Sequence, residues 1–305
     1  MDVLFVLSFL DGSRKTLKHP VEFSCLSSTD TPAESLKAVF IVNDPETWKQ
    51  EVESVTVRVG AQNLFRGGCD RQIIRLSQKG CHLTIWARSL AAALLDNEAI
   101  PQEYHNISVN EVFEKHIRPY GFQNDLGVTG RLASYRVPKG ISEWEAFSRF
   151  CSRAVGRTPY VAGNRVRFFT QGNGNKVITP KLYPVKQVSY TIRRTETISQ
   201  VLIRDKSGQY RTSVSNPTAQ KFHIVRRRAL IPSPEWAQPT INAALQMKKS
   251  MAHRTASEII LSQVLDWEIG SDIVLSIPGF YLRGNIMERE IGFNQQGEYT
   301  KLTIE

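Results

Sequence analysis

The residues best suited to acid–base or metal chemistry are scattered along the chain. None of the histidines forms an H-x-x-x-H pair or combines with cysteine at zinc spacing. Cys81 and His82 are neighbours, but in a strand their side chains point to opposite faces and cannot pair as nucleophile and base. We therefore expect no catalytic residue, no metal site and no cofactor. We interpret the six histidines as surface or half-buried side chains: His19, His82, His105, His116, His223 and His253.

The cysteines are equally dispersed and include no C-x-x-C pair: Cys25, Cys69, Cys81 and Cys151. Four cysteines at this spacing fit neither structural zinc nor the disulfide scaffold of a chain of 305 residues. In the hairpin predicted around a turn at residues 78–80, Cys81 lies opposite Leu76, so we expect no bridge from Cys69 to Cys81. We interpret the cysteines as buried, reduced thiols.

Two further patterns resemble ligand sites at first sight. Asp266, Glu268 and Asp272 cluster near Gly270, but a calcium loop has a different spacing, and aspartate beside glycine is typical of a turn at a strand end. Residues 172–176 are rich in glycine and asparagine without the Gly-Lys-Ser/Thr order of a phosphate loop. We interpret the first as a turn and the second as a connection between domains.

Basic residues flank a helix predicted at residues 237–253, at Lys248, Lys249, His253 and Arg254. Positive charge near the carboxyl end of a helix is favoured by the helix dipole, so a solvated face explains the pattern. A contact with acidic groups on a neighbouring subunit or partner explains it equally well. Both interpretations stay open.

The composition is that of an ordinary folded protein, with 41% hydrophobic residues and a formal net charge of +10. Lysine and arginine are spread along the chain, and the densest cluster is residues 226–228, so we expect no nucleic acid contact as a primary function. The apolar run at residues 3–10 lacks a basic start and favours a buried strand over a signal peptide. We expect no membrane span, because no other stretch reaches the ~20 apolar residues required.

Strand patterns dominate both ends of the chain. Residues 1–88 contain several short apolar or alternating runs, closed by a hairpin at residues 64–76 and 81–88, and indicate a first small β-barrel. Residues 176–305 return to strands, interrupted by the helix at residues 237–253, and indicate a second barrel.

Residues 89–175 have the mixed pattern of a small α+β domain. Two helices start with a capping-box motif, Ser108 with Glu111 and Ser142 with Glu145, in which the serine caps an amide and the glutamate reaches back. The predicted fold class is therefore mainly β with an α+β insertion: two small β-barrels in tandem separated by a small α+β domain.

The ends of the two strand regions also resemble each other. The offset between matching patterns drifts from 283 − 66 = 217 to 302 − 83 = 219, which requires small gaps. Such similarity indicates two related β units in one chain. The matches are residues 65–67 with 282–284, 70–72 with 288–290, Gly80 with Gly297, and 83–85 with 302–304.

The run FRGGCDRQ at residues 65–72, followed by HLTIWARS at residues 82–89, resembles the baseplate hub family of Mu-like contractile phages, a late control protein D-like superfamily. RPYG at residues 118–121 and Trp144-Glu145-Ala146 extend the resemblance along nearly the whole chain. The resemblance implies a homotrimer whose two barrels per subunit form a pseudo-sixfold ring between a hexameric tail tube and a trimeric central spike. The middle domain is comparable with a LysM-like module.

From this resemblance we expect a structural baseplate hub, not an enzyme. Its partners would be the tail tube or tube-initiator protein, the central spike and other baseplate proteins. The protein would be in the bacterial cytoplasm during assembly and then in the baseplate of a virion or of a bacteriocin-like or other contractile injection particle. The main alternative is a carbohydrate- or peptidoglycan-binding module centred on residues 89–170.

Overall fold

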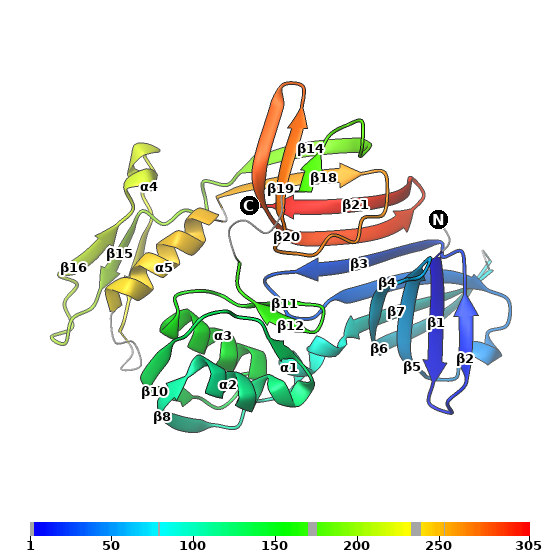
Figure 1. Ribbon diagram of the computed structural model, residues 1–305, viewed down its shortest axis with the longest axis horizontal. Coiled ribbons are helices and arrows are strands. Elements are labelled where there is room, and N and C mark those ends of the chain that lie inside the picture. Colours follow the sequence, from blue (N-terminus) through cyan, green and yellow to red (C-terminus); the bar gives the residue numbers. More distant parts are fainter. Residues whose placement is uncertain (1–2, 79, 170–175, 233–238, 253) are drawn as a thin grey trace.

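The computed structural model describes residues 3–78, 80–169, 176–232, 239–252 and 254–305. Within them, one 13-stranded sheet draws strands from both ends of the chain, and three smaller sheets accompany it (Figure 1). The protein is therefore mainly β with helices inserted between the strand regions, as the sequence predicts.

The first region supplies seven strands, whose alternating burial places one side chain in two in a core around Phe5, Phe40 and Leu83. The predicted hairpin is confirmed: Leu76 lies opposite Cys81, although Lys79 of its turn is outside the described residues. The elements are β1 (Val3–Phe9), β2 (Arg14–Leu17), β3 (Glu22–Ser28), β4 (Ser35–Val42), η1 (Glu46–Trp48), β5 (Val52–Val59), β6 (Gln62–Ser77) and β7 (Gly80–Ser89).

The middle region packs two helices, α2 and α3, with short strands around a core of its own that includes Phe113, Phe147 and Phe150. Its elements are η2 (Leu90–Ala92), α1 (Ala93–Asp96), β8 (Gln102–Ser108), α2 (Val109–His116), η3 (Arg118–Tyr120), β9 (Gln123–Asn124), β10 (Arg131–Val137), α3 (Glu143–Ala154), β11 (Tyr160–Ala162) and β12 (Arg165–Arg167).

The helix starts of the middle region follow the predicted caps, with one difference. At α2, Ser108 Oγ accepts from the Glu111 amide at 3.3 Å and the Glu111 carboxylate accepts from the Ser108 amide at 2.8 Å, which confirms the capping box. At α3, Ser142 Oγ accepts from the Glu145 amide at 3.2 Å. The Glu145 carboxylate contacts Arg149 one turn later, so only half of the second predicted box is present among the described contacts.

The last region supplies β13 and β14 to the large sheet. The chain then leaves this sheet and returns to it at β18. The excursion forms a three-stranded sheet covered by α5 with a small separate core, and it projects to one side of the molecule (Figure 1). The sequence pattern did not separate it from the second β region. The elements are β13 (Lys176–Ile178), β14 (Val185–Ile192), β15 (Gln200–Ile203), β16 (Thr212–Ser215), α4 (Pro217–Lys221), β17 (Arg227–Leu230), α5 (Pro239–Ala252), β18 (Thr255–Leu261), β19 (Asp272–Ile277), β20 (Phe280–Asn294) and β21 (Gly297–Ile304).

The two ends of the chain meet where β20 pairs with β3, from Glu288 opposite Ser28 to Phe293 opposite Phe23. This pairing joins both strand regions into one sheet, yet each keeps its own core. These two separate cores are consistent with the two related β units that the sequence predicts. Among the described strands, however, the main path of the sheet runs from β14 to β2 and no ring of pairings closes, so the chain alone shows no closed barrel.

Candidate assembly surface

Three arginines make polar contacts at junctions between the parts of the fold: Arg88, Arg167 and Arg289. Among the described residues, no group of three or more histidine, cysteine, aspartate or glutamate side chains is arranged to hold a metal ion. No helix in the same residues has the length and apolar character to cross a membrane.

The three carboxylates near Gly270 do not form one cluster. Asp266 pairs with Arg289, Glu268 pairs with Arg167 at 2.8 Å, and Asp272 pairs with Arg283 at 3.0 Å. The predicted turn is present, since the Ser271 amide donates to the Glu268 carbonyl and Gly270 has φ of +82°. The carboxylates therefore tie this turn to its surroundings, and the Glu268 pair attaches it to the middle region.

Arg289 is the central side chain of the junction between the two strand regions, and it is buried. Its guanidinium pairs with Asp266 and donates to the Trp267 carbonyl at 2.8 Å and to Ser27 Oγ of β3 at 3.1 Å. Glu34 lies 3.6 Å away. A buried guanidinium requires such partners, and these contacts tie β20 to Ser27 of β3 and to the segment before β19.

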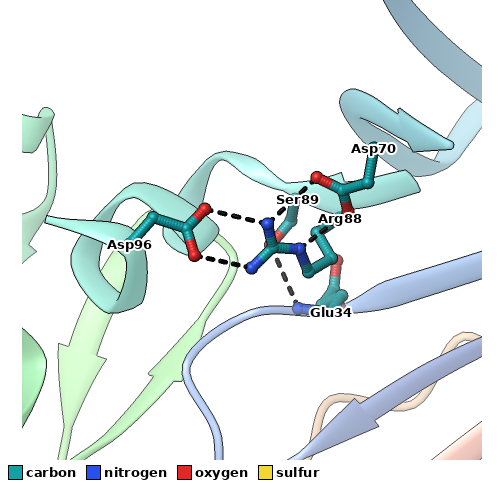
Figure 2. A network of polar contacts seen from close by, with 5 residues as sticks. All are labelled: Glu34, Asp70, Arg88, Ser89 and Asp96. Atoms are coloured by element: carbon teal, nitrogen blue, oxygen red, sulfur yellow. Dashed lines mark hydrogen bonds and ion pairs between the residues drawn. The ribbon is translucent and has the colours of Figure 1, made fainter. Parts of the chain in front are cut away.

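Arg88, at the end of β7, joins the first strand region to the middle region (Figure 2). It donates to Asp70 of β6 at 2.7 and 3.0 Å and to Asp96 of α1 at 2.9 and 2.8 Å. This hydrogen bonding raises the pKa of Arg88 and lowers the pKa of Asp96. Beside it, Ser89 Oγ accepts from the Glu34 amide at 3.1 Å, so β7 is held on both sides where the chain enters the middle region.

A hollow of about 580 Å³ lies where the three regions meet. Its lining draws on β6, on the segment after η3 and on the turn before β19, so it is a gap between regions. Its wall includes Leu64 and Phe65 from the first region, Tyr120 and Phe122 from the middle region, and Ile269 and Arg289 from the last region.

His116 differs from the sequence interpretation, because it is buried. Its Nε2 lies 3.0 Å from the Tyr104 hydroxyl and its Nδ1 contacts the Glu143 carboxylate. Burial and the nearby Glu143 raise the pKa of Tyr104. The three side chains link β8, α2 and α3 inside the middle region, and only helix packing, which brings α2 against α3, places them together.

The predicted repeat becomes exact in the long strands β6 and β20. Gly67 and Gly284 stand at equivalent places, at an offset of 284 − 67 = 217 residues. A Cβ on Gly67 would lie 2.0 Å from the Arg88 carbonyl, and one on Gly284 would lie 2.6 Å from the Glu305 carbonyl, again 217 residues apart. Each long strand therefore needs glycine where it passes closest to its neighbour.

The pairing irregularities obey the same offset. A register shift leaves Asp70 of β6 with no residue opposite it on β7, and another leaves Met287 of β20 with no residue opposite it on β21. The hairpins that follow turn at Gly80 and Gly297. The drift to 219 inferred from sequence was therefore wrong: β6–β7 and β20–β21 align over the whole hairpin without a gap.

The order of strands extends the equivalence beyond the hairpins. In the first region the order is β3-β4-β7-β6-β5, and in the last region it is β14-β18-β21-β20-β19, with every pair antiparallel. The chain thus contains the same five-stranded arrangement twice, and the β3–β20 pairing places one copy beside the other.

Comparison with solved structures finds this fold in tail proteins. A tail protein from Neisseria meningitidis matches with a TM-score of 0.80 at 16% identity, covering 100% of this chain and 96% of its own. A 43 kDa tail protein of prophage MuSo2 from Shewanella oneidensis matches at 0.73 and 12% identity, covering 100% and 97%. The fold is that of phage tail proteins.

The tail-protein fold also occurs in a type VI secretion component of E. coli, c3393, with a TM-score of 0.54 at 10% identity, covering 99% of this chain and 74% of the other. That protein is described as structurally similar to the T4 bacteriophage tail proteins gp27 and gp5. No family model matches the chain, and no curated protein matches its sequence. The likeness therefore rests on three-dimensional structure.

Proposed function

We propose that the protein is a structural baseplate hub of a phage or phage-like tail, a homotrimer that joins the hexameric tail tube to the trimeric central spike. The observation that carries the proposal is the duplicated five-stranded arrangement, at a constant offset in its long hairpins. A trimer of such a chain presents two similar β units per subunit, so it offers six similar surfaces on a threefold axis.

The three parts have separate roles in this proposal. Residues 1–88 and 176–305 supply the two β units, each completed as a barrel in the assembly, and residues 89–175 form the LysM-like middle domain beside them. The tube or tube-initiator protein binds the sixfold face, and the spike and other baseplate proteins bind the threefold side. Assembly takes place in the bacterial cytoplasm before the particle is complete.

The work of a hub is done by interface area and shape, without a reaction, which fits its fold neighbours among tail proteins. Because a tail sustains mechanical load, the buried Arg289 junction inside each subunit has a direct role: it keeps the two β units at a fixed mutual orientation.

The test is the mass of the purified chain by light scattering over a range of concentrations, alone and with a tube protein encoded beside it. We expect three times the subunit mass of 34.5 kDa in at least one of the two conditions, and threefold particles with sixfold pseudosymmetry in electron micrographs. A monomer in both conditions contradicts the proposal.

A further inference from the structure

We propose that β14 of one copy adds to the outer edge of β6 of the next copy, in the register that β3 uses on β20 within the chain. The inference deepens the proposed function, on which it rests, by naming the strands and residues that join subunits. Its basis is the duplication: if β6 corresponds to β20 and β14 to β3, the internal junction is a template for the external one.

Both strands have an unpaired edge where the template has a partner. From Glu288 to Phe293, β20 pairs with β21 on one side and with β3 on the other. The corresponding stretch of β6, from Arg71 to Leu76, pairs with β7, and no other described strand pairs with it. β14 pairs with β18 and ends the sheet, whereas β3 pairs with both β4 and β20. Open strand edges are templates for pairing with another chain.

The side chains along these edges show the same contrast. On β3, Cys25 and Ser27 face the core and are 0% and 1% exposed. Their equivalents on β14, Tyr190 and Ile192, also face the core side, opposite Ser257 and Thr255 of β18, but each is 53% exposed. Apolar side chains stand where the template is buried, and the described chain does not cover them.

The edge of β6 repeats this arrangement. Ile74 and Leu76 lie opposite Leu83 and Cys81 of β7, which places them on the core side of the sheet, yet Leu76 is 73% exposed. A row of apolar side chains therefore ends abruptly at each of the two edges. One row matches the other in chemistry, and both belong to the same chain, so the occupant that fits is a second copy.

The template sets the register. Phe293 opposite Phe23 becomes Leu76 opposite Val188, and Ile291 opposite Cys25 becomes Ile74 opposite Tyr190. The same antiparallel register puts Gln72 opposite Ile192. One step further, Arg71 faces Arg193, and like charges directly opposite are unfavourable, so the pairing ends there.

One position makes the external junction looser than the internal one. A Cβ on Gly292 would lie 2.6 Å from the Phe23 carbonyl, and the equivalent of Gly292 on β6 is Arg75. The incoming β14 must therefore lie slightly farther from β6 at Arg75 than β3 lies from β20. A looser contact is suited to subunits that fold first and assemble afterwards.

The contact is heterologous, since each copy offers β6 to one neighbour and β14 to the other. Repetition of a heterologous contact gives a closed ring when the rotation closes and a filament when it does not. In a trimeric hub, three external junctions alternate with three internal ones, and the two types of junction together make the pseudo-sixfold ring.

Disulfide trapping tests the register on the full-length chain. The pairs Ile73→Cys with Thr191→Cys and Ile74→Cys with Tyr190→Cys sample both kinds of antiparallel pair, of which only the closer kind closes readily. We expect oxidation of at least one pair to give covalent dimers and trimers on a non-reducing gel. The controls are each single variant and the shifted pair Ile73→Cys with Ser189→Cys, which should stay monomeric on the gel.

A charge variant provides the second readout. Leu76→Lys should weaken self-association by about tenfold or more, because it replaces buried apolar surface with a charge. The matched control is Val225→Lys, since Val225 is 84% exposed on a different part of the chain and should leave the mass unchanged. Circular dichroism establishes that both variants fold.

The outcomes separate this inference from the function on which it rests. A trimer that forms no in-register cross-link and is indifferent to Leu76→Lys overturns the β6–β14 junction and leaves the hub intact. Cross-links with a tube protein at these cysteines, but not between copies, assign the edge to another partner and overturn the inference. A monomer under every condition overturns both.

Discussion

The junction at Arg289 provides the sharpest test of how the two β units are held together. Arg289→Ala removes a guanidinium whose side chain is 6% exposed, together with its pair to Asp266 and its bonds to the Trp267 carbonyl and Ser27. Breaking a buried ion pair on one side costs about 3–5 kcal/mol. Because Asp266 is 41% exposed and regains water, we expect the lower end, about 3 kcal/mol.

The matched control is Lys37→Ala, on β4 of the same sheet. Lys37 also makes an ion pair, with Glu22 of β3 at 2.7 Å, but both side chains are nearly half exposed, at 45% and 47%, so its loss should cost below about 1 kcal/mol. The assay is urea unfolding followed by tryptophan fluorescence, comparing the midpoint and slope of the first transition, since several cores need not unfold together. Equal costs for the two variants would refute the reasoning that burial gives Arg289 its weight.

Two further predictions concern the repeat and the Arg88 network. Gly67→Ala should lower the unfolding midpoint more than Gly284→Ala, because its Cβ would lie 2.0 Å from the Arg88 carbonyl, whereas a Cβ on Gly284 would lie 2.6 Å from the Glu305 carbonyl; thermal melts compare the two, and equal losses contradict this. Asp96→Asn should cost at most about 1 kcal/mol at pH 7, since the side chain is half exposed. Hydrogen bonding from Arg88 lowers the pKa of Asp96, so this contribution is present above the ordinary value of 3.8 and is lost as the pH falls through the lowered pKa. Unfolding of wild type and variant should therefore converge in acid, and a constant difference down to low pH is the contrary result.

Local features of the chain were predictable because they depend on neighbours in sequence. The Ser108 capping box needs four consecutive residues, and the register of Leu76 opposite Cys81 follows from the length of one turn. The duplication was visible through Gly67 and Gly284, since close approach of two strands leaves room for no other residue.

Features that depend on distant contacts were not predictable in the same way. His116 has no local partner that indicates burial, and its contacts to Tyr104 and Glu143 come from helix packing. The carboxylates around Gly270 are close in sequence, yet each pairs with a different arginine, one on β12 and two at separate places on β20.

The sequence by itself determined the strand-rich character, the α+β insertion, the hairpins and the presence of two similar units. Tertiary structure alone decided that the units share one sheet through β3 and β20, that Arg289 is buried between them, and that β6 and β14 keep exposed edges. The reason is physical: turns and caps are set by a few adjacent residues, whereas the pairing of strands more than two hundred residues apart depends on which edges the rest of the fold leaves open.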